Sequence, residues 1–126
     1  MRSWIITQLC SPVDNGKLED RLVHLYPVAT SIPKAELQGH SPLVKEFLML
    51  TLGVLGNGAH PQQSDPRRVY RNFAKMFVLL VKSGINCEDL SESATRIVPY
   101  LRMYHTQEND EICDSIIQLT ENRFGP

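Results

Sequence analysis

The side chains with the clearest capacity for binding chemistry are five cations spaced along one predicted helix. At about 100° per residue, a helix over residues 66–82 gathers them within an arc roughly 100° wide. Cations four residues apart can contact successive phosphates or a row of carboxylates. We therefore predict a partner-binding surface, the basic row, which consists of Arg67, Arg68, Arg71, Lys75 and Lys82.

The opposite charge gathers towards the C-terminus. Residues 64–84 carry five basic and one acidic side chain, whereas residues 85–126 carry three basic and eight acidic ones, within a net charge of −1. A second charged face, the acidic row, is expected on the last helix and consists of Asp110, Glu111, Asp114 and Glu121. Three interpretations stay open: the rows bind partners, they face water, or they face each other within the fold.

Residues that would support catalysis or metal binding do not cluster in the sequence. The four histidines lack zinc-site spacing, and the three cysteines form no CxxC pair. Cys87 and Cys113 fall on or near apolar helix faces, where a thiol is normally buried and inert. Adjacent acids such as Glu88 and Asp89 do not converge on one side of a helix. We therefore expect no enzyme activity, no cofactor, no metal and no small-molecule substrate.

The helix over residues 66–82 is expected to form the centre of the fold. Pro66 suits the first position of a helix, and Asp65 before it can cap that helix. Apolar residues follow one stripe and then surround the helix near its end, which is typical of a helix enclosed by protein. The stripe consists of Val69, Phe73, Met76 and Leu80, with Tyr70 and Phe77 beside it.

The preceding helices are predicted from caps and breakers. One helix is expected to close at Pro27, because proline interrupts a helix. A short helix over residues 33–37 is expected to end at Gly39, and a longer one to start at Pro42 and reach about residue 55. These breaks predict a helical hairpin in this part of the chain.

The following helices carry similar signals. Gly84 is expected to end the central helix, and Asn86 and Thr106 to cap the last two. Pro99 is expected to kink the first of these two helices or split it.

The whole chain is expected to be one all-α domain over residues 1–126, a compact bundle of five to seven helices. Residues 1–13 are predicted to be an arm or short helix that Trp4 docks on the body, and residues 57–65 a mobile loop. The longest apolar run is far shorter than the ~20 residues that span a bilayer. Three widely spaced cysteines suit a reducing compartment, so we expect a cytoplasmic or nuclear protein that is not in a membrane.

The segment SIPKAELQGHSPLVKEFLMLTLGVLGNGA resembles an armadillo/HEAT-type helical repeat. The resemblance rests on Ile32-Pro33, the turn at residues 39–41 and the ending at residues 52–57, and a looser copy aligns Leu101 with Leu55. It covers about half the chain and implies a stack of helical hairpins that binds protein or peptide along a groove, without catalysis. Another helical bundle is the alternative. The spacing of IPKAEL and residues 64–82 is also similar to the N-terminal domain of transcription elongation factor S-II, which docks short peptides.

These observations predict an interaction or adaptor module that binds a protein or peptide partner. Self-association into a homo-oligomer is a further possibility, because opposed charged faces can meet between copies. The alternative function is RNA or DNA binding through the basic row, with an affinity that depends on salt.

Overall fold

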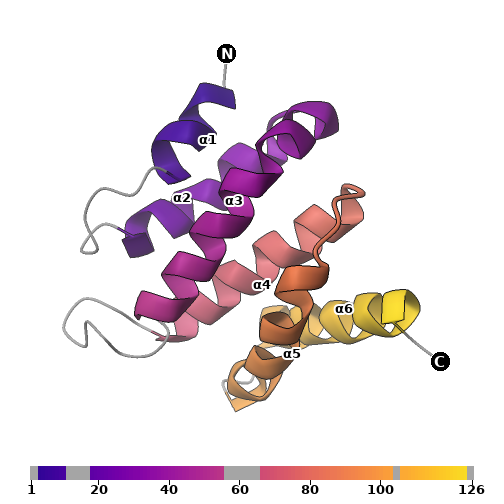
Figure 1. Cartoon of the computed structure of the whole chain (residues 1–126). Coiled ribbons are helices and arrows are strands. Elements are labelled where there is room, and N and C mark those ends of the chain that lie inside the picture. Colours follow the sequence, from indigo (N-terminus) through magenta and orange to yellow (C-terminus); the bar gives the residue numbers. More distant parts are fainter. Residues whose placement is uncertain (1–2, 11–17, 56–65, 104–105, 125–126) are drawn as a thin grey trace.

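The fold is built around α4 (Pro66–Lys82), the helix that the apolar stripe predicted. The computed structural model describes residues 3–10, 18–55, 66–103 and 106–124, and every element among them is a helix (Figure 1). Helix α4 packs against four helices of the bundle, and α1 covers α2 and α3. The other elements are α1 (Ser3–Cys10), α2 (Leu18–Thr30), α3 (Lys34–Leu55), α5 (Glu88–Met103) and α6 (Gln107–Phe124). The prediction of an all-α bundle is confirmed.

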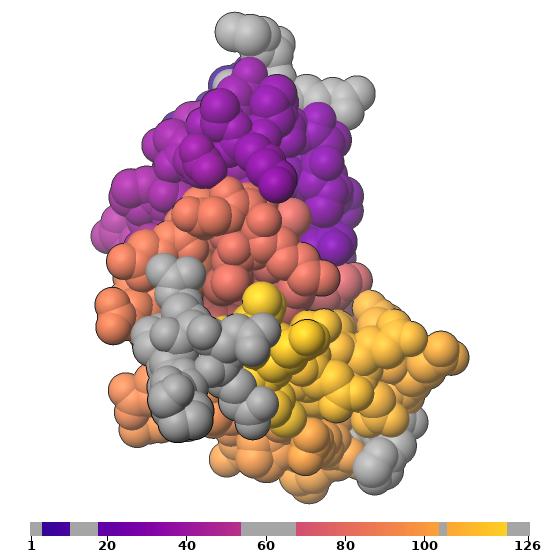
Figure 2. Space-filling view, turned by 90° about the vertical axis from the view of Figure 1, so that its right-hand side faces the viewer, coloured from indigo at the N-terminus to yellow at the C-terminus, as the bar shows by residue number. Residues whose placement is uncertain are grey.

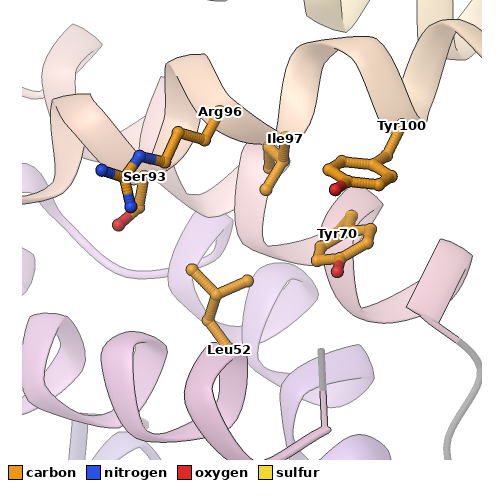
Figure 3. A pocket seen from close by; sticks show the side chains of 6 residues that line it. All are labelled: Leu52, Tyr70, Ser93, Arg96, Ile97 and Tyr100. Atoms are coloured by element: carbon orange, nitrogen blue, oxygen red, sulfur yellow. The ribbon is translucent and has the colours of Figure 1, made fainter. Parts of the chain in front are cut away.

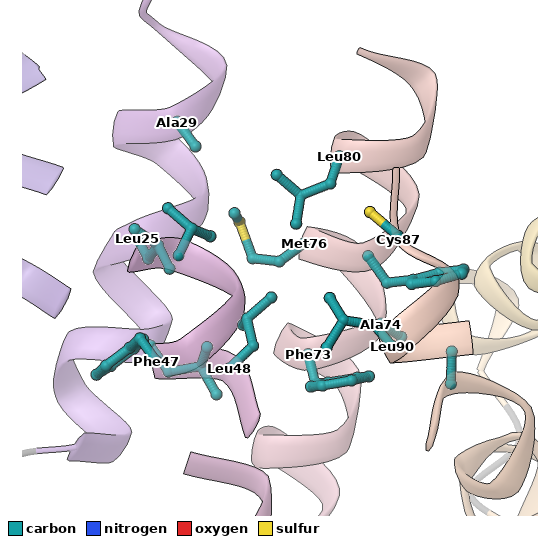
Figure 4. Close-up of a cluster of buried hydrophobic side chains, with 14 of the residues drawn as sticks. Leu25, Ala29, Phe47, Leu48, Phe73, Ala74, Met76, Leu80, Cys87 and Leu90 are labelled. Carbon is teal, nitrogen blue, oxygen red and sulfur yellow. The ribbon is translucent and has the colours of Figure 1, made fainter. Parts of the chain in front are cut away.

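The core lies on both sides of α4. Figure 4 shows Leu25 of α2 and Phe47 of α3 on one side of Met76, with Leu90 of α5 on the other side of the helix. All four residues of the predicted stripe are at most 1% exposed. Burial of each such side chain contributes about 1.5–3 kcal/mol relative to exposure, so this stripe of α4 is a major part of the stabilising core.

Part of α4 still reaches the surface. Figure 2 shows it as a band between α2 and α3 on one side and α6 on the other. Any partner that contacts this part of α4 must therefore also meet the helices that flank it.

Three of the predicted helix ends are confirmed in atomic detail. The side-chain oxygen of Asn86 accepts a hydrogen bond of 3.0 Å from the backbone N–H of Glu88, which caps α5. The hydroxyl of Thr106 accepts one of 3.0 Å from the N–H of Asn109, which caps α6. Gly84 ends α4 with a φ of 81°. The predicted cap at Asp65 lies outside the described residues.

Gly84→Ala is expected to lower the free energy of unfolding by about 1–2 kcal/mol, because an L-residue is strained at positive φ. An added Cβ would lie 3.6 Å from Nε2 of Gln38, an ordinary contact, so the cost comes from the backbone. Gly39→Ala is the matched control: it lies inside α3 with nothing within 4 Å of the new Cβ, and should stabilise by about 0.5–1 kcal/mol. Urea unfolding of both variants tests this, and a shift of the same sign in both would contradict it.

The hairpin expected between residues 33 and 55 is not formed, because α3 is a single helix that runs through Gly39 and Pro42. Pro42 lacks the N–H that would donate to the carbonyl of Gln38. The hydroxyl of Ser41 donates to that carbonyl instead, at 2.8 Å. This local replacement allows the helix to continue, so the predicted ending at Gly39 and new start at Pro42 were wrong.

Pro27 and Pro99 also lie inside helices. Helix α2 continues past Pro27 to Thr30, whose hydroxyl donates to the carbonyl of Pro27 at 2.8 Å, so the predicted end at Pro27 was wrong. Helix α5 is not split at Pro99. The carbonyl that Pro99 leaves without its usual donor belongs to Thr95, an exposed residue where water can replace the missing bond.

Residues 3–10 form a short helix, which is one of the two alternatives predicted for the N-terminal segment. Ile6 and Cys10 of α1 face the core, but Trp4 is 58% exposed. The expected docking of Trp4 on the body was therefore wrong, because the buried face of α1 follows the spacing from Ile6 to Cys10 and leaves Trp4 off that face. Residues 11–13 and the predicted mobile loop at 57–65 lie outside the described residues. None of the described helices combines the length and apolar content needed to cross a membrane.

Candidate functional site

The basic row of α4 is largely engaged within the fold. Nη1 of Arg68 lies 3.3 Å from Oε1 of Glu19 on α2, and Glu19 is only 7% exposed. A buried carboxylate is stabilised best when a guanidinium hydrogen-bonds to it directly. Arg68 therefore links α4 to α2.

A second carboxylate links the row to α6. Oε1 of Glu108 lies 3.0 Å from Nζ of Lys75, and Oε2 of Glu108 lies 3.9 Å from Nη1 of Arg71. The ammonium of Lys75 also lies over the ring of Tyr26, 4.9 Å from its centroid, in a cation–π arrangement. For these two cations, pairing within the fold is the interpretation that the geometry favours.

The remaining charged positions face outward or lie outside the description. Lys82 is exposed and lines a groove of about 260 Å³ between α4 and α6, together with Lys75 and Glu111. Asp110, Glu111 and Asp114 of the acidic row are exposed on α6. The side chains of Arg67 and Glu121 are outside the described residues. Among the cations of the row whose side chains are described, Arg68, Arg71 and Lys75 contact carboxylates, so these three do not form an open cationic surface.

A different surface forms where α3 and α5 flank α4. At one end Nζ of Lys45 on α3 lies 3.4 Å from Oδ2 of Asp89 on α5. One turn further along both helices, Sδ of Met49 lies 4.0 Å from Oγ of Ser93. The order of these two contacts shows that α3 and α5 run in the same direction, bridged by side chains at the Lys45 end.

Beyond this bridge the two helices enclose a groove of about 360 Å³, which we call the α3–α5 groove. Figure 3 shows side chains entering it from α3, α4 and α5, with its middle left open. This volume falls in the range of ligand sites in proteins, about 300–1,000 Å³. The lining residues are Leu52, Tyr70, Ser93, Arg96, Ile97 and Tyr100.

Large apolar side chains remain exposed at and around this groove. Tyr100 is 51% exposed, although its ring lies 5.3 Å from that of Tyr70. Met49 is 42% exposed, and Met103, one turn beyond Tyr100 on α5, is 67% exposed. Tyrosine, methionine and arginine are the residue types enriched at protein interfaces. The exposed side chains here are therefore of types that are common at protein interfaces.

The thiols are placed as inert core residues. Cys10, Cys87 and Cys113 are buried and are not joined in disulfides. Burial raises the pKa of the Cys10 thiol from 9.0 to about 12, and burial also raises the pKa of Cys113. A thiol held protonated is a poor nucleophile. Within the described part of the chain, no three His, Cys, Asp or Glu side chains converge on a possible metal position.

The raised pKa of Cys10 predicts a loss of stability in alkali. Because its pKa is higher in the folded state, the contribution of this thiol is complete below the unfolded pKa, near 9, and is lost as the pH rises towards the folded pKa of about 12. We expect the free energy of unfolding to fall by about 1 kcal/mol between about pH 9 and pH 10 from this group. Urea unfolding at several pH values tests this against Cys10→Ala. Equal slopes in the two proteins would contradict the assignment.

Sequence reasoning did not find the α3–α5 groove. Tyr70 was placed beside the core stripe of α4, but Leu52, Ile97 and Tyr100 were not expected to meet it. One signal was present: Tyr100 and Met103 are large apolar residues that lie off the buried stripe of α5. A helix with apolar residues outside its buried face indicates a second contact surface.

In comparisons with known proteins, the chain matches no family model, no curated protein and no solved structure. The resemblances to armadillo/HEAT repeats and to the elongation factor domain therefore stay predictions, and a function must be inferred from the groove, the charges and the exposed side chains.

Proposed function

We propose that the protein is a non-enzymatic interaction module that binds a protein or peptide partner in the α3–α5 groove. The observation that carries this proposal is the half-exposed Tyr100 ring, held beside Tyr70 in a groove that Leu52 and Ile97 also line. Aromatic residues that fill pockets at the centre of an interface contribute much of its binding energy.

The groove is supported by rigid elements, which favours binding. Its walls are helices that pack on α4, and the Lys45–Asp89 pair joins the two walls at one end. A site built on packed helices needs little ordering when a partner binds, so less binding energy is lost to entropy.

The side chains that line the groove are better suited to binding a partner than to catalysis. Its titratable groups are two phenols and one guanidinium, none of which is an effective base near neutral pH. Burial raises the pKa of the Cys10 and Cys113 thiols, as described above, so neither is a good nucleophile. We therefore propose an adaptor role, and three cysteines that are not joined in disulfides support a reducing compartment such as the cytoplasm or nucleus.

Nucleic-acid binding through the basic row has less support. Arg68, Arg71 and Lys75 already lie within 4 Å of carboxylates of α2 and α6. A phosphate backbone would have to compete with these pairs, and electrostatic affinity depends on the number of cations that remain available.

Site-specific photo-crosslinking tests the proposal. A benzophenone side chain replaces Tyr100 in the groove or, as a matched control, Gln118 at an exposed site of α6. The proposal expects a discrete crosslinked partner from position 100 only, whose purified form binds the unmodified protein and binds Tyr100→Ala more weakly. Crosslinking of the same proteins from both positions, or none from position 100, would overturn it.

A further inference from the structure

The α3–α5 groove has two ends of different chemistry. Figure 3 shows Ser93 and Arg96 of α5 at one end and the neighbouring, tilted rings of Tyr70 and Tyr100 at the other. Between them Leu52 of α3 and Ile97 of α5 form the apolar walls. The lining includes one cation and no carboxylate. A ligand that matches it carries one negative charge beside an apolar group.

The guanidinium of Arg96 has N–H groups that can donate hydrogen bonds to such a ligand. Its Nη2 lies 2.7 Å from Oε1 of Glu92, one turn earlier on α5, and both side chains are about three-quarters exposed, at 76% and 75%. A guanidinium has five N–H donors, and one carboxylate uses at most two of them. An exposed pair of this kind is weak, so a second carboxylate can share or replace Glu92 at small cost.

The size of the groove limits the occupant. A volume of about 360 Å³ accommodates a few side chains of a short segment. A second copy of the chain would need a flat contact of about 800 Å² on each partner to form a stable dimer. The groove and its single cation therefore fit a peptide better than another bundle.

We infer that the α3–α5 groove recognises an acidic, apolar peptide segment, with a carboxylate bound to Arg96 and an apolar side chain placed between Leu52, Ile97 and the tyrosine pair. This inference rests on the proposed function and specifies its partner class. The carboxylate would sit at the Ser93 end, and the apolar side chain would cover the exposed ring of Tyr100.

Peptide display with the full chain tests the inference. A library of random short peptides is selected on the protein, and selected peptides are labelled and titrated by fluorescence anisotropy. We expect enrichment of peptides with Asp or Glu close to a large apolar residue. Arg96→Gln should weaken their binding about tenfold. Glu92→Gln should strengthen it about twofold, because it removes the competing carboxylate.

Arg96→Gln and Glu92→Gln each remove one exposed charge, and a change in folding is not expected to shift the peptide affinity in opposite directions. Replacing the peptide Asp by Asn should abolish both effects, which assigns them to a direct contact. Peptides that lack an acidic residue but lose binding in Tyr100→Ala would overturn the inference and leave the proposed function standing. Three results would overturn both the inference and the proposed peptide site. The first is that selected peptides bind Tyr100→Ala unchanged, and the second is that no peptides are enriched. The third is that light scattering shows a dimer that Tyr100→Ala converts to monomer.

Discussion

Phe73→Ala is expected to lower the free energy of unfolding by about 3–5 kcal/mol, because it removes a buried aromatic ring and leaves a cavity. Phe73 is 1% exposed and lies on α4, where helices pack on both sides. The interior cannot collapse fully onto the missing volume, so contacts are lost on more than one helix. Urea unfolding followed by circular dichroism measures the loss.

Tyr100→Ala is the matched control for this substitution. It removes a ring of similar size, but the ring is half exposed and its main aromatic contact is Tyr70. The expected cost is about 1 kcal/mol, the range of a single aromatic pair. Equal losses in Phe73→Ala and Tyr100→Ala would contradict the placement of α4 at the centre of the core.

The second large effect is on binding. Tyr100→Ala is expected to lower the affinity for the peptide selected by display about thirtyfold, which corresponds to ~2 kcal/mol, the threshold of an interface hot spot. The reason is that the ring supplies the exposed apolar surface that a bound side chain would cover. Isothermal titration calorimetry of the folded variant measures the change.

Tyr26→Ala provides the comparison for the binding effect. Tyr26 also carries a partly exposed ring, but it lies beside Lys75 in the groove between α4 and α6. This substitution should leave the affinity within about twofold of the original. A larger loss in Tyr26→Ala than in Tyr100→Ala would move the binding site to the α4–α6 groove.

The features that could be predicted from the sequence are those set by neighbouring residues. The stripe from Val69 to Leu80 identified the buried face of α4, because its spacing follows the helix period. Asn86, Thr106 and Gly84 marked helix ends, because their caps and left-handed backbone are local properties. These signals do not require knowledge of how the helices pack.

The helix breaks predicted at Pro27 and Pro42, and the split considered at Pro99, did not form, because the effect of a proline depends on what replaces the missing hydrogen bond. At Pro42 the replacement is the hydroxyl of Ser41, and at Pro99 the freed carbonyl belongs to an exposed turn. Packing of the surrounding helix then outweighs a local cost of about 3 kcal/mol. A pattern of breakers alone cannot show whether such compensation exists.

The sequence alone could not show which charged and apolar side chains remain open to a partner, because this depends on contacts between residues that are far apart in the chain. Glu19 and Glu108 lie about 90 residues apart in the sequence, yet both pair with cations of α4. The α3–α5 groove likewise needs three helices in a definite register before Leu52, Tyr70 and Tyr100 can meet. The predicted basic row identified a helix with many cations but not the groups that neutralise them.

Methyl-resolved NMR of the full chain, titrated with the selected acidic peptide, tests most directly whether the partner binds between α3 and α5. The protein has reporter methyl groups in both grooves. Shifts at Met49, Leu52 and Ile97, with little change at Val78 and Ile112 of the α4–α6 groove, are expected. Shifts concentrated at Val78 and Ile112 would contradict the proposed site and return the binding surface to the basic side of α4.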